Sequence, residues 1–258
     1  MAGIPLSDDY PVRRIPIVTY LLVAANVTVY LLSPMSQLAV WYSAELGARL
    51  CSVDVYLLHW AAFPTELLTG RQLTAEQAAA FTSCPVGEYT KVPWMSSVSS
   101  MFLHGGALHL LGNMVYLFVF GPCVEDRLGR LRYLAIYLLS GVVACYGFVL
   151  GEGIGTTPMV GASGAISGVL GAYLVVQFRS RVITLVLGFI PVRLPGWLMV
   201  GAYFALQYFL YLSLSISPDA ENNTAYGAHV YGFIAGLTSG LLIYRVRWRS
   251  GARLSDVH

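Results

Sequence analysis

Residues 161–179 read GASGAISGVLGAYLVVQFR, and residues 228–245 read AHVYGFIAGLTSGLLIYR. Each stretch is apolar apart from a few small polar residues and ends in an arginine. Ser163 stands near the start of the first stretch and His229 near the start of the second, each 16 residues before the final arginine. If both stretches are helices whose arginines meet the same membrane face, the serine and the histidine lie at one depth in the bilayer.

The composition agrees with a membrane protein. The chain is 57% hydrophobic and only 11% charged, with a mean hydropathy of +0.66, whereas about 25% of the residues in soluble domains are charged. Several apolar runs approach the ~20 residues that span a bilayer. We therefore predict an all-α polytopic membrane protein, with one membrane domain over 15–245 and six transmembrane helices near 15–33, 97–121, 132–150, 162–178, 196–216 and 225–244.

The arginines orient these spans. Twelve of the 15 basic residues lie before the first span, at alternate connections and after the last span, namely Arg13, Arg14, Arg127, Arg130, Arg132, Arg179, Arg181, Arg193, Arg245, Arg247, Arg249 and Arg253. The other three, Arg49, Arg71 and Lys91, lie in the long first loop. Basic loops stay on the cytoplasmic side. The pattern predicts that the N-terminus (1–14) and the basic tail (246–258) are cytoplasmic and that the long loop at about 34–96 lies outside.

The long first loop is rich in aromatic residues, which favour the membrane interface, so we expect it to be structured and to rest there. Thr74 followed by Gln77 is typical of a capping box at the start of a short helix. Cys51 and Cys84 both lie in this loop. They either form a disulfide in an oxidising compartment or remain two unpaired thiols.

Few strongly polar residues fall within the predicted spans, and such residues usually face a functional interior. They are His104, His109 and Asn113 in the second span, Ser163 and Ser167 in the fourth, His229 in the sixth, Asn26 in the first and Gln207 in the fifth. Sixteen helical residues rise roughly 24 Å, which places Ser163 and His229 about 6 Å below the outer surface of a ~30 Å hydrocarbon layer. His109 and Asn113 lie near that depth on one helix face.

Glycines recur about every fourth residue in the fourth and sixth spans, at Gly164, Gly168, Gly171, Gly232, Gly236 and Gly240. Small residues at this spacing let transmembrane backbones approach closely, which would bring Ser163 towards His229 as a nucleophile and its base. Each feature also has a simpler interpretation. A membrane serine commonly bonds a carbonyl of its own helix, the role we assign to Ser167. A lone histidine is more often structural or part of a transport site, and glycine repeats alone indicate packing.

These residues resemble the rhomboid family of intramembrane serine proteases over about 93–245. The matching elements occur in the family's order, and they are Pro93-Trp94, Ser100–Gly106, His109–Met114, Gly121, Glu125, Arg127–Gly129, Gly161–Ala165, Ala228-His229, Gly232 and Gly236. The resemblance implies a rhomboid-like six-helix bundle, and it says little about the unusually long outer loop at 34–92. It also implies a Ser–His dyad without a third acid.

In that dyad, the resemblance makes Ser163 the nucleophile and His229 the general base, with His109 and Asn113 as donors to the oxyanion. The supporting residues would be His104, Gly161, Gly164, Gly232 and Gly236. One departure concerns Ser167, because many bacterial members have an aromatic residue there that stacks on the histidine. The resemblance therefore leaves open what supports the His229 ring.

We expect a hydrolase that cleaves transmembrane proteins near the outer face, with the bilayer and membrane substrates as partners and with no metal, cofactor or nucleic acid. We also expect residues 151–157 to form an irregular loop before the fourth span, residues 217–224 to cap the site, and substrate to enter beside the second and fifth spans. The competing functions are a pseudoprotease that binds membrane clients without cutting them and a small-solute transporter, for which no repeat is evident. A bacterial plasma membrane is the expected location, and the oligomeric state stays open.

Overall fold

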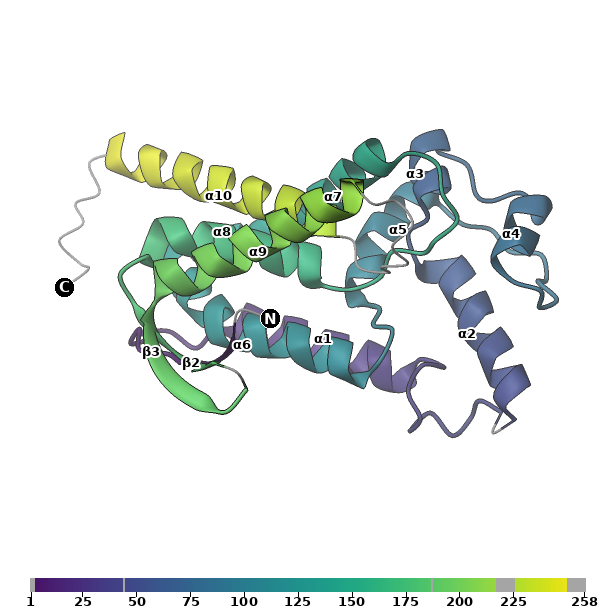
Figure 1. Ribbon diagram of the computed structural model, residues 1–258, viewed down its shortest axis with the longest axis horizontal. Helices are drawn as coiled ribbons and strands as arrows, with labels where there is room; N and C mark the ends of the chain where they lie inside the picture. Colours follow the sequence, from purple (N-terminus) through teal and green to yellow (C-terminus); the bar gives the residue numbers. More distant parts are fainter. Residues whose placement is uncertain (1–2, 44, 187, 217–225, 250–258) are drawn as a thin grey trace.

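The computed structural model describes residues 3–43, 45–186, 188–216 and 226–249 (Figure 1). The chain is mostly helical. Six helices fall on the predicted spans, namely α1 (Ile17–Leu32), α6 (Ala107–Leu128), α7 (Arg130–Glu152), α8 (Ser163–Gln177), α9 (Gly196–Ile216) and α10 (Tyr226–Arg249). Between α1 and α6 lie α2 (Leu46–Trp60), α3 (Pro64–Thr69), α4 (Ala75–Phe81), α5 (Pro93–Ser99) and the 3-10 turn η1 (Ser100–Phe102).

Within these ranges, three helical segments are long and apolar enough to cross a membrane, namely Ala107–Leu128, Arg130–Gly151 and Tyr226–Arg245. The apolar helices α1 and α8 are shorter. The chain is therefore a multi-pass membrane protein. These helices coincide with the six predicted spans to within a few residues, except at both ends of the second span and at the end of the sixth.

The predicted span at 97–121 begins in the wrong place. The apolar run is interrupted, because η1 ends at Phe102, residues 103–106 are not helical, and α6 starts only at Ala107. The paired glycines Gly105 and Gly106 explain the break, since glycine weakens helices and supplies no side chain to pack. His104 therefore lies in the connection before α6, outside the span to which the sequence assigned it.

A small antiparallel sheet departs from the all-α prediction. It pairs β1 (Ile4–Asp8) with β2 (Arg181–Val186), and β2 with β3 (Ile190–Pro195), in the order β1-β2-β3. Val182 and Thr184 in β2 are fully buried, so the strand alternates as a half-buried strand should. The sheet lies at one end of the helix bundle (Figure 1). From the sequence, residues 4–8 were predicted only as part of the segment before the first span, and residues 181–195 only as a connection between the fourth and fifth spans.

Helix α8 occupies the centre of the bundle, and every residue from Gly164 to Tyr173 is buried. It packs against α6, α7 and most extensively α10. A Cβ added at Gly232 would collide with the backbone oxygen of Gly164, and one at Gly236 with that of Gly168. The two backbones therefore touch, which is the close approach that the glycine spacing predicted. We call this contact the glycine seam.

The start of α1 is held by a buried carboxylate from α6. Glu125 accepts the backbone N–H groups of Val18 (3.0 Å) and Thr19 (2.8 Å), together with the Thr19 hydroxyl (2.9 Å). A carboxylate at a helix N-terminus satisfies orphan amides and is favoured by the helix dipole. This contact fixes α1 against the end of α6 that lies away from Ser163.

Residues 46–92 form a separate group of short helices at the end of the bundle away from the sheet (Figure 1). We call this segment the loop lobe. A disulfide joins Cys51 of α2 to Cys84, with the two Cα atoms 5.5 Å apart. The predicted capping box is confirmed, because Thr74 caps α4 and Gln77 bonds back to it. A small apolar cluster centred on Leu58 and Phe63 fills the interior of the lobe.

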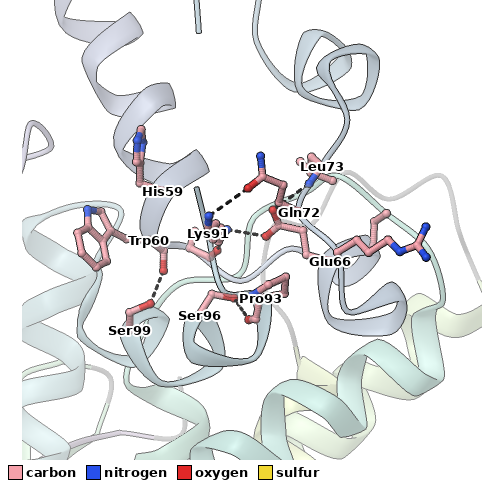
Figure 2. Close-up of polar contacts among 12 residues, drawn as sticks. His59, Trp60, Glu66, Gln72, Leu73, Lys91, Pro93, Ser96 and Ser99 are labelled. Carbon is pink, nitrogen blue, oxygen red and sulfur yellow. Dashed lines mark hydrogen bonds and ion pairs between the residues drawn. The ribbon is translucent and has the colours of Figure 1, made fainter. Parts of the chain in front are cut away.

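A buried ion pair also holds the loop lobe (Figure 2). Lys91 Nζ lies 2.5 Å from a carboxylate oxygen of Glu66, and both side chains are almost fully buried. The ammonium group also donates to the Ala61 carbonyl at 2.6 Å, and the other Glu66 oxygen accepts the Leu73 N–H at 3.1 Å. Burial lowers the pKa of Lys91, and the adjacent Glu66 opposes that shift.

Candidate active site

Ser163 and His229 meet in the structure. Ser163 Oγ lies 2.8 Å from His229 Nε2, within the 2.6–3.2 Å reach that a nucleophile and its base require. Ser163 is the first residue of α8, and His229 lies in the first turn of α10. His229 is buried, with 9% of its surface exposed. The equal distance of the two residues from their arginines predicted this proximity.

The glycine seam explains how two residues 66 positions apart are brought together. Successive close contacts join Gly164 to Gly232 and Gly168 to Gly236, and Gly240 then packs on the next turn of α8. Because the contacts advance along both helices in the same direction, α8 and α10 run parallel with their N-terminal turns side by side. The register of the seam therefore places Ser163 opposite His229.

The other ring nitrogen of His229 has a partner that the sequence did not reveal. Nδ1 lies 2.8 Å from Oε1 of Gln207 on α9. The Tyr226 ring approaches the imidazole edge to face, with centroids 6.2 Å apart. Gln207 was recognised as a polar residue within a span, but its 22-residue separation from His229 carries no signal for the contact.

Ser167 makes a different contact from the one predicted. Its hydroxyl lies 3.3 Å from the hydroxyl of Tyr203, which is on the neighbouring helix α9. Tyr203 and Gln207 are four residues apart and share one face of α9. That face therefore carries polar contacts both to α8 and to α10.

His109 and Asn113 lie beside the backbone that leads into Ser163. A Cβ added at Gly161 would lie 2.8 Å from the His109 ring and 3.7 Å from the Asn113 amide nitrogen. Gly161 has a φ of +123°, which favours glycine on conformational grounds as well. The Asn113 amide nitrogen also lies 2.9 Å from His104 Nε2, and the His104 and His109 rings meet edge to face at 5.1 Å. His104 thus contacts both predicted oxyanion donors.

The segment between α7 and α8, residues 153–162, is irregular, and the loop lobe braces it. It overlaps the irregular loop predicted at 151–157, but residues 151 and 152 still belong to α7. Thr65 donates its N–H (3.2 Å) and its hydroxyl (3.0 Å) to the Gly155 carbonyl. Ala62 and Met159 exchange a pair of backbone hydrogen bonds at 3.3 and 2.7 Å, and the Gly161 N–H donates to the Ser100 carbonyl at 2.9 Å. Irregular backbone is tolerated at membrane depth only where such partners cover it.

A cavity of about 1000 Å³ opens onto these residues. Its walls come from α6 to α10 and from the irregular segment before α8, and they include His109, Asn113, Ser163, Gln207 and His229. The predicted cap at 217–224 lies outside the described residues. Across those residues, no group of three or more histidine, cysteine or acidic side chains is arranged to hold a metal ion.

The family model described as the Rhomboid domain matches residues 92–246 of the chain. The chain belongs to the rhomboid family. The resemblance drawn from the sequence motifs is thereby confirmed, and the match covers the whole of α5–α9 and nearly all of α10. The loop lobe lies before the matched region, so the family model says nothing about its structure.

Several relatives of this rhomboid carry protease names. The putative rhomboid protease YdcA of Bacillus subtilis is 40% identical over 91 residues, which are 35% of this chain and 45% of YdcA. Rhomboid-type serine protease 2 of Emericella nidulans is 30% identical over 155 residues, 59% of this chain and 27% of that protein. RHOMBOID-like protein 5 of Arabidopsis thaliana is 33% identical over 152 residues, 57% of this chain and 43% of that protein. The chain therefore spans less than half the length of these relatives.

Proposed function

We propose that this rhomboid is an intramembrane serine endopeptidase that cleaves transmembrane segments of other membrane proteins. The observation that carries the proposal is the 2.8 Å contact between Ser163 Oγ and His229 Nε2, made inside a cavity between apolar helices. The protease names of the relatives from Bacillus subtilis and Emericella nidulans support the same reaction class.

The first step is attack on the scissile carbonyl. His229 Nε2 accepts the Ser163 proton while Oγ forms a bond to the carbonyl carbon, whose π electrons move onto oxygen. The imidazolium then returns the proton to the departing amine nitrogen as the C–N bond breaks, which leaves an acyl group on Ser163. Water then attacks that ester while His229 takes its proton, and the imidazolium returns the proton to Ser163 Oγ as the bond from the acyl carbon to Oγ breaks. The cycle releases a carboxylic acid, regenerates Ser163 and consumes one water molecule.

The oxyanion formed in these steps requires hydrogen-bond donors. We assign this role to His109 and Asn113, which flank Gly161 just before the nucleophile. Backbone N–H groups at the start of α8 add to it, because the first amides of a helix have no intrahelical acceptor. Removing one such donor in a dry site typically costs about 3–4 kcal/mol of transition-state stabilisation.

Substrate would reach the dyad through the cavity wall formed by α6 and α9. The rings of Tyr116 on α6 and Tyr203 on α9 lie 5.4 Å apart there, so this wall must open to admit a helix. A crosslink between α6 and α9 is expected to stop cleavage of a transmembrane substrate while Ser163 still reacts with a small fluorophosphonate. Unchanged cleavage by the crosslinked protein would contradict this route.

The arginine clusters support cytoplasmic termini, which would place Ser163 towards the outer face of a bacterial plasma membrane. A substrate whose transmembrane segment contains helix-weakening residues near that face should be cut most readily, because the peptide must unwind before its carbonyl reaches Ser163. A reporter with the same residues moved to the cytoplasmic half provides the comparison.

The test reconstitutes the full chain in liposomes with a transmembrane reporter and compares wild type with Ser163→Ala and His229→Ala. Cleavage by wild type alone is the expected result. Cleavage that persists in Ser163→Ala would refute the mechanism. A wild type that binds the reporter without cutting it would instead support a pseudoprotease.

A further inference from the structure

The histidine of a Ser–His dyad works only in one tautomer. A neutral imidazole carries a single proton, and Nε2 must be free of it to accept the proton of the Ser163 hydroxyl. The proton therefore resides on Nδ1, which in turn needs an acceptor at hydrogen-bond distance. In proteases with a catalytic triad, a buried carboxylate provides that acceptor.

In this structure the atom opposite Nδ1 is Oε1 of Gln207, at 2.8 Å. We propose that Gln207 is the positioning residue that holds His229 in the productive tautomer, an inference that rests on the proposed protease function. Its amide oxygen accepts the Nδ1 proton, so Nε2 presents its lone pair to Ser163 Oγ, also at 2.8 Å. When the ring becomes an imidazolium during attack, the same bond becomes charge-assisted and therefore stronger.

The other contacts of the ring do not replace this one. Tyr226 approaches only edge to face, with centroids 6.2 Å apart, and a ring contact of this kind selects no tautomer. One turn after the nucleophile, Ser167 directs its hydroxyl to Tyr203. The His229 side chain thus has one described polar partner on each nitrogen, the nucleophile on Nε2 and Gln207 on Nδ1.

Because Gln207 is on α9, the ability of His229 to act as a base also depends on the position of that helix. The nucleophile is on α8 and the base on α10, two helices joined by the glycine seam, whereas Gln207 comes from the helix that forms the wall of the cavity. Displacing α9 would withdraw the acceptor without moving Ser163 from His229. Proton transfer would therefore be fully supported only when α9 is packed against α8 and α10.

An amide differs from a carboxylate because it can present either an acceptor or a donor. Two substitutions of Gln207 therefore predict opposite effects on kcat. Gln207→Met keeps an unbranched side chain of similar length but removes the acceptor. Gln207→Glu keeps an oxygen at the same reach. Leu212→Met is the matched control, because it places the same new side chain on the same helix at a position that is 42% exposed.

The experiment measures kcat and KM for cleavage of a transmembrane reporter in liposomes by the full chain. We expect Gln207→Met to lower kcat by roughly 10- to 100-fold, the effect of one hydrogen bond to a charged group, with KM within about twofold of wild type. We expect Gln207→Glu to restore kcat to within about threefold of wild type and Leu212→Met to leave both constants unchanged.

Equal kcat values for Gln207→Met and Leu212→Met would overturn the inference. It would also be overturned if Gln207→Met and Gln207→Glu lost the same activity or changed mainly KM, because a general packing role predicts that pattern. If Gln207→Met does not fold, Gln207→Asn takes its place in the comparison. The shorter side chain holds its amide oxygen too far from Nδ1 to accept the proton, so kcat should fall in the same way. Wild type no more active than Ser163→Ala would refute the proposed function itself, and this inference with it.

Discussion

The glycine seam and the loop lobe both hold Ser163 in place, but they do so by different physical means. At the seam, side chains are absent at Gly232 and Gly236, so that the backbones of α8 and α10 touch. The loop lobe instead combines a disulfide between Cys51 and Cys84 with a buried ion pair. Between transmembrane helices there is little hydrophobic driving force, and close van der Waals packing takes its place. The lobe has fewer than about 50 residues and only a small core, so it relies on cross-links.

The seam and the lobe therefore control two different properties of the site. The seam sets the distance between Ser163 and His229, on which proton transfer depends directly. The lobe sets the backbone just before the nucleophile through the bonds of Thr65 to Gly155 and of Ala62 to Met159. Changes in the seam should therefore damage cleavage more than changes in the lobe.

The largest effect is expected from Gly236→Ala. The new Cβ would collide with the backbone of Gly168, and backbone cannot move aside as a side chain can. The helices must separate, and a displacement of about 1 Å at a catalytic pair can lower the rate about 100-fold. The control is Gly201→Ala on α9, where a Cβ meets no atom within 4 Å. If both variants cleave the reporter equally well, the glycine seam does not set the distance between Ser163 and His229.

An intermediate effect is expected from Lys91→Met. It leaves the Glu66 carboxylate buried without its cation, which typically costs about 3–5 kcal/mol of stability. The rate of amide hydrogen exchange should rise in α3, including at the Thr65 amide that donates to Gly155. Cleavage should fall by up to about tenfold, a loss of about 1.4 kcal/mol in transition-state stabilisation. The double variant Lys91→Met with Glu66→Leu removes both charges and should recover most of the loss. If exchange in α3 stays at its wild-type level in the single variant, the ion pair does not hold the lobe.

The smallest effect on cleavage is expected from opening the disulfide with Cys51→Ser. A disulfide that closes a loop of this length stabilises the folded state by about 2–4 kcal/mol, mainly because it restricts the conformations of the unfolded chain. The ion pair still holds α3, so thermal stability should fall while cleavage at low temperature changes little. The double variant Cys51→Ser with Cys84→Ser is the control, because it opens the same bond without leaving a free thiol on Cys84. A loss of cleavage as large as that of Gly236→Ala would contradict the ranking.

Much of this arrangement follows from spacing alone. The equal distance of Ser163 and His229 from their arginines and the four-residue glycine repeats predicted the meeting of the two residues, because membrane thickness and helix rise convert sequence distance into depth. His109 and Asn113 were placed on one helix face because they are four residues apart. The family match was likewise predictable, because its motifs occur in order along the chain.

Other features depend on contacts that spacing does not encode. Gln207 faces His229 because of how α9 rotates and packs, and nothing within the α9 sequence specifies that angle. The β1–β2 pairing joins residues 4–8 to residues 182–185, and a short strand carries a weak sequence signal. The start of α6 was missed because hydropathy does not mark the break at Gly105 and Gly106, where the chain stays largely apolar.

The most direct test of the central claim is to label the full chain in liposomes with a fluorophosphonate and to identify the modified residue by mass spectrometry. Our account predicts a covalent adduct on Ser163 in wild type and labelling slowed by at least about 100-fold in His229→Ala, because the hydroxyl then lacks its base. An adduct on another residue, or equally rapid labelling of Ser163 without His229, would contradict the account.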